Sequence, residues 1–368
     1  MNTAPALAIW HAGVSAVGGY EATMRALQQD APTKPDQIIA VGKAAGAMMC
    51  AGLDHFGKVP ALVVTKDGHG AGLPDHVRLI EAAHPVPDAR SLAGGRTLRE
   101  TVAGMAHGSH LLLLVSGGAS SLAEDPVAGK TLEDLQALNR QLLGAGLDIG
   151  AMNRERRKVS RIKGGGLLSH FRGAAVQVLA ISDVPGDDLA IIGSGLGSAP
   201  ERFDFTYQAQ IVASNTIARA AAARKADTLG IKVLARDEVL HDDLEILATD
   251  IGARIRTMDK GVMILGGEPT VILPPNPGRG GRNQALALAL AREIAGIDGL
   301  SLVVAGTDGS DGPTDAAGAM VDGSTWGPGA AEALTNADSG SYLDAKGALL
   351  ITGPTGTNVM DLLVAIRA

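Results

Sequence analysis

Short apolar runs alternate with amphipathic stretches along the first half of the chain. Apolar runs of about 4–8 residues are typical of buried strands. They predict strands at Ile38–Val41, Ala61–Thr65, Leu79–Ala82, Leu111–Val115 and Val176–Ile181. The amphipathic stretches predict helices at Ala44–His55, Ser91–Met105, Leu132–Leu143 and Ile149–Val159. Such alternation is typical of a mostly parallel sheet with helices on both faces.

A segment rich in Gly, Ser and Pro, Gly193–Thr206, interrupts this pattern and is the predicted hinge. The second half predicts strands at Val262–Leu265, Val271–Leu273, Leu300–Ala305 and Ala348–Ile351. Its predicted helices are Thr216–Leu229, Asp243–Thr257, Gln284–Ala295 and Asn358–Arg367. We therefore expect two α/β domains, a Rossmann-like domain at residues 1–205 and a smaller mixed domain at residues 206–368.

Composition narrows the class of protein. The length of 368 residues and the 46% hydrophobic content suit two domains with real cores. The net charge is -7, and the chain has only two Trp, three Tyr and four Phe. Nucleic-acid binders usually cluster basic and aromatic residues, so we expect no nucleic-acid partner. Cys50 is the single cysteine, which excludes an intrachain disulfide and a cysteine-based zinc site.

Two features predict a cytoplasmic protein without a membrane partner. The N-terminal segment Met1–Ala12 lacks a basic stretch before an apolar core, so it does not resemble a secretory signal. The conspicuous apolar run Leu111–Val115 is far too short to cross a bilayer.

Glycine is unusually frequent, with 49 residues, and it gathers after predicted strands. Glycine lets backbone N–H groups approach an anion closely. Lys43 stands in one such strand-to-helix turn and predicts a phosphate or carboxylate clamp. A second turn predicts an anion cradle built from Ser116, Gly117, Gly118 and Ser120. The alternative for both is an ordinary exposed turn.

A basic segment, Asn153–Gly166, ends in three glycines. In an acidic protein it could attract a triphosphate, and we predict phosphate contacts from Lys163, Gly164 and Gly165. The alternative is a charged face exposed to solvent.

Carboxylates follow three other predicted strands. Asp183 lies in one loop, Glu268 in a second, and Asp308 and Asp311 in a third. Magnesium is commonly bound by one or two carboxylates together with substrate phosphates, so Asp183, Asp308 and Asp311 are predicted metal ligands. Ordinary turn chemistry is the alternative. Arg282 opens a predicted helix and could hold a carboxylate or phosphate in bidentate fashion.

Common nucleotide motifs do not account for these glycines. Gly129-Lys130-Thr131 ends like a P-loop, but Glu124 stands where its first glycine is required. The run Gly193–Ser198 resembles GxGxxG but ends in serine and follows no clear strand.

Nine segments in order along nearly the whole chain resemble the class II glycerate kinases, or MOFRL family, some of whose members are called hydroxypyruvate reductases. They are VGKAAGAMM, AAHPVPDARS, SGGASSL, MNRERRKVSRIKGGGLL, ISDVPGDD, GGEPTV, GRGGRNQALALALA, AGTDGSDGPTDAAGAMVDG and ITGPTGTNVMDLL. The resemblance implies transfer of the γ-phosphoryl group of ATP to glycerate, giving 2-phosphoglycerate, with Mg²⁺. It also implies two α/β domains with the active site in the cleft between them.

The resemblance implies catalytic roles for Lys43 and Arg282, to which we add Asp183. Substrate binding is expected from Lys43, Arg282, Glu268 and Asn283, and nucleotide binding also from Asn215. The expected partners are a small hydroxy acid and a nucleotide, with a homodimer left open.

Two loops depart from the family pattern, which usually has SGGGSALL at Ser116 and an IASGPT-like run at Ile192–Gly197. These departures leave another C3–C4 hydroxy acid open as the substrate. An NAD(P)H-dependent hydroxypyruvate reductase stays open because of the family names and the imperfect GxGxxG run. A non-catalytic nucleotide-binding regulator is the third alternative.

Overall fold

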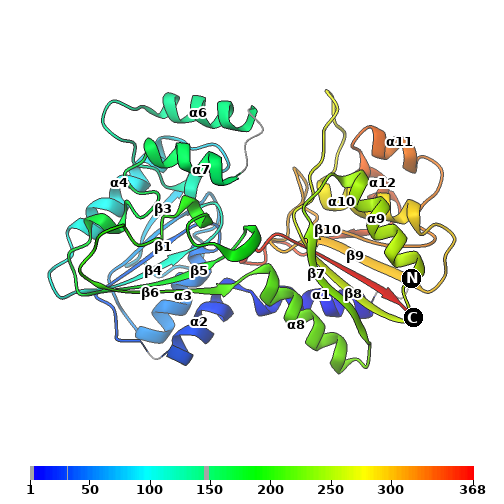
Figure 1. Cartoon of the computed structure of the whole chain (residues 1–368), viewed down its shortest axis with the longest axis horizontal. Helices are drawn as coiled ribbons and strands as arrows, with labels where there is room; N and C mark the ends of the chain where they lie inside the picture. Colours follow the sequence, from blue (N-terminus) through cyan, green and yellow to red (C-terminus); the bar gives the residue numbers. More distant parts are fainter. Residues whose placement is uncertain (1–3, 31, 145–148) are drawn as a thin grey trace. The chain divides into compact units, whose positions relative to one another are not determined.

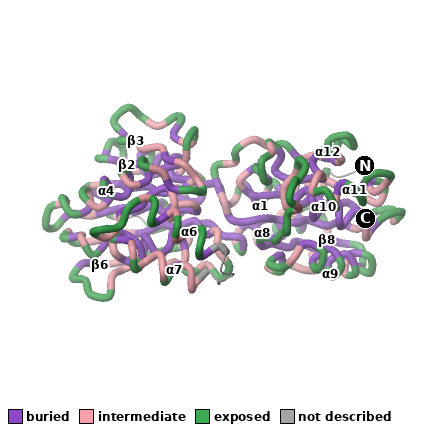
Figure 2. The backbone as a smooth tube through the Cα atoms, turned by 90° about the horizontal axis from the view of Figure 1, so that it is seen from above, coloured by how far each residue is buried: buried purple, intermediate pink, exposed green. Residues whose placement is uncertain are grey.

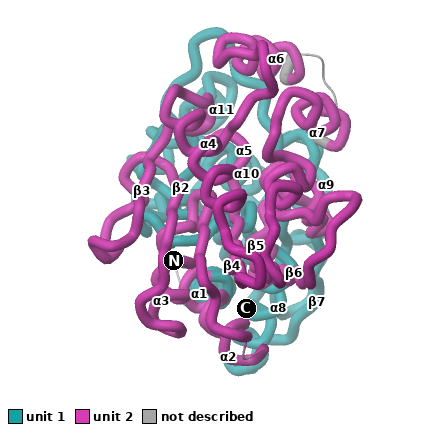
Figure 3. The backbone as a smooth tube through the Cα atoms, turned by 90° about the vertical axis from the view of Figure 1, so that its left-hand side faces the viewer, with its two compact units in different colours: residues 1–17, 215–368 teal, residues 18–214 magenta. Residues whose placement is uncertain are grey.

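The computed structural model describes residues 4–30, 32–144 and 149–368. The chain forms two compact units: unit 1 comprises residues 1–17 and 215–368, and unit 2 comprises residues 18–214 (Figure 3). These bounds differ from the predicted division after residue 205. Helix α1 (Ala4–Ala16) packs against α8 (Asn215–Thr228), a long-range contact that local sequence patterns do not reveal.

Unit 2 contains a six-stranded sheet in the order β3-β2-β1-β4-β5-β6, and every neighbouring pair is parallel. Its strands are β1 (Gln37–Val41), β2 (Ala61–Lys66), β3 (Arg78–Ala82), β4 (His110–Val115), β5 (Ala175–Ile181) and β6 (Thr206–Ala213). This is the strand order of the Rossmann fold, and it confirms the predicted fold class. Strand β6 begins at the end of the predicted hinge and was not predicted.

Helices cover both faces of this sheet. Helices α2 and α3 pack on one face, and α4 and α5 on the other (Figure 1). The helices of unit 2 are α2 (Gly19–Asp30), α3 (Ala45–Phe56), α4 (Ala89–Ala103), α5 (Ala119–Leu122), α6 (Leu132–Gly144) and α7 (Ile149–Lys158), with short 3₁₀ turns η1 (Leu168–His170), η2 (Pro185–Asp187) and η3 (Ile192–Ser194). Figure 2 shows buried backbone running through the centre of each unit.

Unit 1 has a mixed six-stranded sheet in the order β11-β10-β9-β12-β8-β7. Only the pair β7–β8 is parallel among the described pairs of this sheet. Its strands are β7 (Val233–Leu240), β8 (Gly261–Gly267), β9 (Leu300–Gly306), β10 (Gly318–Asp322), β11 (Leu349–Leu350) and β12 (Asp361–Arg367).

Two separate apolar cores cover the faces of the unit 1 sheet. One core joins the sheet to α1 and α8, and the other joins it to α9 and α10. The remaining helices are α9 (Leu244–Thr257), α10 (Arg282–Glu293), α11 (Ala330–Thr335) and α12 (Ser339–Ala345). No helix in the described residues is long and apolar enough to cross a membrane.

Two predicted elements of unit 1 are wrong. The predicted helix Asn358–Arg367 is largely strand β12, which lies between β8 and β9 in the sheet. Its side chains enter both cores alternately, so the segment reads as a continuous apolar run. Such a run does not distinguish a strand from a helix by periodicity. The predicted strand Val271–Leu273 lies in an irregular, largely exposed segment.

Candidate active site

The first part of the candidate site lies in unit 2, where two neighbouring strands end. Lys43 follows β1 and the loop Ser116–Gly118 follows β4, and these two strands pair directly. The order of the sheet reverses between them, and open α/β sheets bind ligands at such a point. The backbone N–H of Lys43 donates to the carbonyl of Gly117 at 2.9 Å, which joins the two loops.

The Ser116 hydroxyl is part of this connection. It accepts a hydrogen bond from the N–H of Ala44 at 3.1 Å and lies 3.4 Å from the carbonyl of Val41, to which it donates. Ser116 is 1% exposed, so its hydroxyl positions the loops. This geometry does not support the predicted phosphate contact from its side chain. A side chain at Gly42 would overlap Ser116, which explains the glycine there.

Polar side chains surround Gly117 and Gly118. A Cβ atom at Gly118 would lie 3.1 Å from the His84 imidazole and 3.2 Å from Cγ of Lys43. A Cβ atom at Gly117 would overlap the carboxylate of Asp183. The structure therefore brings Lys43 and Asp183 to the same glycine loop. It adds His84, which follows β3 and was not singled out in the sequence, although its segment AAHPVPDARS belongs to the matching motifs. Ser120 is half-buried in the first turn of α5.

The end of the basic segment is engaged in contacts within unit 2. The ammonium group of Lys163 is buried and forms an ion pair with Glu124. The N–H groups of Gly164 and Gly165 donate to the carbonyls of Ser194 and Gly195, at 2.9 and 3.0 Å. These donors are engaged inside unit 2 because the triple-glycine turn packs against the loop at η3. The structure therefore does not support Lys163, Gly164 and Gly165 as phosphate ligands.

The side chain of Asn215 is hydrogen-bonded inside unit 1. Its amide nitrogen donates to the carbonyls of Val359 and Asp361, each at 3.0 Å, and its oxygen accepts from Arg219 at 2.8 Å. Asn215 is 1% exposed. The side chain connects the start of α8 to β12, which does not support the predicted nucleotide contact.

The second part of the candidate site lies in unit 1 at the start of α10. Arg282 forms ion pairs with Glu268 at 2.7 Å and with Asp361 at 3.1 Å. Burial alone would lower the pKa of Arg282, but the two carboxylates raise it above its ordinary value. Arg282 therefore stays charged in a half-buried position. Glu268, predicted to bind substrate, lies beside Arg282 as its partner.

Asp361 was missed in the sequence because the segment was read as a helix. Its side chain is 3% exposed, and burial raises its pKa to about 7, although the charge of Arg282 opposes this shift. An acidic residue at the start of a buried apolar run is the signal that could have identified it.

Asp311 caps α10 from the loop after β9. Its two carboxylate oxygens accept hydrogen bonds from the N–H groups of Asn283 and Gln284, at 3.0 and 2.8 Å. Burial raises the pKa of Asp311, and these hydrogen bonds partly offset the shift. The structure assigns its oxygens to the helix, which does not support a metal-ligand role. Asn283 is 1% exposed, so its predicted contact with substrate is not supported either.

The predicted metal ligands do not form one cluster within a unit. Asp183 belongs to unit 2, whereas Asp308 and Asp311 belong to unit 1. Over residues 4–30, 32–144 and 149–368, no group of three or more His, Cys, Asp or Glu side chains is placed to hold a metal ion. Asp308 accepts hydrogen bonds from the N–H and hydroxyl of Ser310, at 2.9 and 3.0 Å.

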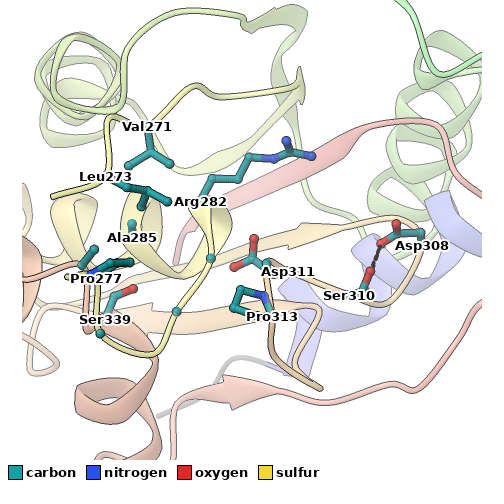
Figure 4. A pocket seen from close by; sticks show the side chains of 15 residues that line it. Val271, Leu273, Pro277, Arg282, Ala285, Asp308, Ser310, Asp311, Pro313 and Ser339 are labelled. Atoms are coloured by element: carbon teal, nitrogen blue, oxygen red, sulfur yellow. Dashed lines mark hydrogen bonds between the residues drawn. The ribbon is translucent and has the colours of Figure 1, made fainter. Parts of the chain in front are cut away.

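A pocket of about 320 Å³ opens beside Arg282, between the start of α10 and the irregular segment before it (Figure 4). Its lining contains both apolar and polar side chains. The apolar residues are Val271, Leu273, Pro277, Ala285, Pro313 and Ala337. The polar side chains are those of Arg282, Asp308, Ser310, Asp311 and Ser339.

Comparisons with known proteins agree across nearly the whole chain. A family model described as a domain of unknown function (DUF4147) matches residues 5–229, and the MOFRL family model matches residues 261–361. The D-glycerate 2-kinase of Thermotoga maritima is 37% identical, with 89% of this chain and 90% of that protein covered. The glycerate 2-kinase of Pyrococcus horikoshii is 33% identical, with 89% and 86% covered. The crystal structure of the T. maritima glycerate kinase superposes with a TM-score of 0.90 at 33% identity, covering 99% of each chain.

Proposed function

The chain belongs to the glycerate kinase (MOFRL) family, and from this premise we propose that it transfers the γ-phosphoryl group of ATP to a hydroxyl of glycerate. Membership makes the chain an enzyme, a glycerate kinase. The product we propose is 2-phosphoglycerate. The observation that carries the proposal is Lys43 beside Gly117 and Gly118, at the point where the strand order of unit 2 reverses.

This geometry suits phosphoryl transfer. The reaction depends on positioning and on neutralising negative charge spread over the transferred group. Lys43 supplies a positive charge next to a loop whose two glycines let Asp183 and His84 approach the backbone closely. Arg282 is the second proposed cation, and its paired carboxylates hold the guanidinium group in a defined direction. We propose that both residues stabilise charge on the phosphoryl group or on the acceptor carboxylate.

Magnesium fits this proposal at Asp183. A carboxylate beside a phosphate-binding loop matches the way magnesium is usually held, by one or two carboxylates together with substrate phosphates. Asp183 would hold the ion, which would offset charge on the ATP phosphates. Asp311 is left out of this role because its oxygens bind the amides of α10.

The turn between β1 and α3 argues against a dinucleotide-dependent reductase. Dinucleotide folds carry G-x-G in the first strand-to-helix turn, so that the backbone can approach the pyrophosphate. Here the turn reads Gly42-Lys43-Ala44, with a lysine in the loop and an alanine where the second glycine is required.

The test is a coupled assay with D-glycerate, ATP and Mg²⁺, which follows ADP release and identifies the phosphoglycerate isomer. We expect turnover that depends on both substrates. Oxidation of NAD(P)H with hydroxypyruvate, without phosphorylation of glycerate, would reverse the assignment. A panel of C3–C6 hydroxy acids would reveal a different preferred acceptor.

A further inference from the structure

We propose that the pocket beside Arg282 in unit 1 binds the adenosine end of ATP, with the purine between aliphatic side chains. The inference rests on the proposed function, since it assigns a place to the nucleotide of that reaction. It concerns residues of unit 1 alone, all of which the structure describes.

The apolar lining favours a purine over the acceptor. Val271, Leu273, Pro277, Ala285 and Pro313 supply aliphatic surface. Glycerate carries a carboxylate and two hydroxyls on three carbons, so it gains little from such walls. A purine presents two apolar faces and a polar edge, which matches a pocket lined by both apolar and polar side chains. None of the described residues that line the pocket is aromatic, so the ring would pack against aliphatic groups (Figure 4).

The charges of the pocket orient the nucleotide. Asp308 and Asp311 line the pocket, and their negative charge repels phosphate groups. A neutral base and ribose avoid this repulsion, and ribose hydroxyls can donate hydrogen bonds to Asp308 or to the hydroxyl of Ser310. Arg282 also lines the pocket, with a side chain that is 37% exposed. This arrangement places the phosphates toward Arg282.

Glycines shape the wall on the helix side. A side chain at Gly281 would overlap Asp311, and a Cβ atom at Gly280 would lie 2.7 Å from the hydroxyl of Ser339. The segment Gly278–Gly281 therefore presents backbone to the pocket. Backbone N–H and C=O groups are suited to the polar edge of a base, because they are fixed in direction.

The segment before α10 provides the most specific argument. Val271 and Leu273 line the pocket, whereas Ile272 between them does not and is 88% exposed. Val271 and Leu273 are themselves 38% and 58% exposed, so both present apolar surface to solvent. A ligand ring packed against them would remove this apolar surface from water, which is favourable.

Ile272 makes a matched control for Leu273, since the two are neighbouring, exposed aliphatic residues of which only Leu273 lines the pocket. We expect Leu273→Asp to raise the KM for ATP roughly tenfold or more, because a charge there opposes an apolar ring. The KM for glycerate should stay within about twofold, and Ile272→Asp should leave both constants unchanged. Fluorescence titration with N-methylanthraniloyl-ADP, with unlabelled ADP as competitor, should show the same contrast in Kd.

The binding measurement separates this inference from the proposed function. ADP binding that is weakened by Leu273→Asp but not by Ile272→Asp would support the pocket even if glycerate were not phosphorylated. A rise only in the KM for glycerate would assign the pocket to the acceptor and overturn the proposal. Unchanged constants in Leu273→Asp, or equal losses in both variants, would also overturn it. Thermal unfolding of each variant checks that the fold is retained.

Discussion

At the scale of single residues, tertiary position decides which of the predicted side chains lie at the glycine loop after β4. Lys43 and Asp183 follow strands that end near the glycine loop, and both meet Gly117–Gly118 there. Lys163 looked equally suitable in the sequence, but its ammonium group is buried against Glu124. Residue type and a neighbouring glycine predict an anion site in both cases. Burial and the ion pair with Glu124 set Lys163 apart from Lys43, the lysine that we propose as a phosphate ligand.

Replacing Lys43 tests the proposed cation of unit 2. We expect Lys43→Ala to lower kcat roughly a hundredfold or more, because a charge aimed at the transferred group is lost. Melting temperature should change little, since the side chain is half-buried in a loop. Lys58→Ala, which removes an exposed lysine of the same unit, is the control. Steady-state kinetics showing an unchanged kcat in folded Lys43→Ala would remove the residue from the mechanism.

Asp361 gives a prediction about pH. Burial raises its pKa to about 7, so the carboxyl is mostly neutral below this pH and ionised above it. The ion pair that positions Arg282 therefore strengthens as pH rises through about 7. We expect kcat to increase over the same range. Asp361→Asn should lower kcat roughly ten- to hundredfold and remove this limb of the pH profile, because Arg282 loses its buried carboxylate.

The same group affects stability in the opposite direction. A folded-state pKa above the unfolded value means that the folded protein binds the proton more tightly. The contribution of Asp361 to stability is therefore present below about pH 4 and is lost as pH rises to about 7. In urea unfolding, the free energy of unfolding of Asp361→Asn should fall less over this pH range than that of the unmodified protein. Asp344→Asn, which alters an exposed partner of Arg279, should change neither the kinetics nor this slope.

At the scale of elements, the first turn of α10 is capped by a residue from the loop after β9. Its N-cap position is Gly281, which has no side chain to cap the helix, and Asp311 supplies the carboxylate instead. The sequence predicted a helix at Gln284–Ala295 within two residues of its real bounds. It could not predict the cap, because Asp311 lies 28 positions from Asn283.

Removing this cap should destabilise the helix that carries Arg282. Asp311→Ala leaves two buried N–H groups without their acceptor, and each such loss costs about 1–3 kcal/mol. We expect a lower melting temperature together with a reduced kcat. Asp315→Ala alters the same loop at a side chain that is 74% exposed, and should shift stability by less than about 0.5 kcal/mol. Equal stability of the two variants would contradict the capping role.

Strand β12 shows where pattern reading fails. The predicted parallel sheet of unit 2 was found because its strands alternate with helices and each apolar run is short. Asp361–Arg367 instead follows a turn-rich segment and has apolar residues at every interior position. Those residues pack alternately into two cores on opposite faces of the sheet. The local hydrophobic pattern cannot show this, because it depends on the tertiary structure.

At the scale of the whole molecule, the two units differ in how the chain builds them. Unit 2 draws its whole sheet from residues 18–214, whereas unit 1 needs α1 from the other end of the sequence. The side chains of Ala6, Ile9, Trp10 and Val14 complete one core of unit 1. The sequence predicted one passage of the chain between domains, near residue 205. It did not predict the other passage, from unit 1 to unit 2 after Val17.

Fragments test this organisation. We expect residues 18–214 to unfold cooperatively on their own, because their sheet and core are complete. Residues 215–368 should be markedly less stable, since burying a large apolar side chain such as Ile9 contributes about 1.5–3 kcal/mol. A synthetic peptide of residues 1–17 should restore their stability in thermal unfolding followed by circular dichroism. Full stability of residues 215–368 without the peptide would refute the requirement for α1.

The discontinuity of unit 1 has a consequence for synthesis on the ribosome. Helix α1 is made before unit 2, whereas α8 and the sheet it covers are made only after all of unit 2. At about 5–20 residues per second, the delay is on the order of ten to forty seconds. During this time Ile9 and Trp10, which are fully buried in the finished protein, have no partner surface to cover them. The nascent segment therefore keeps these apolar side chains without their native partners until unit 2 has been made.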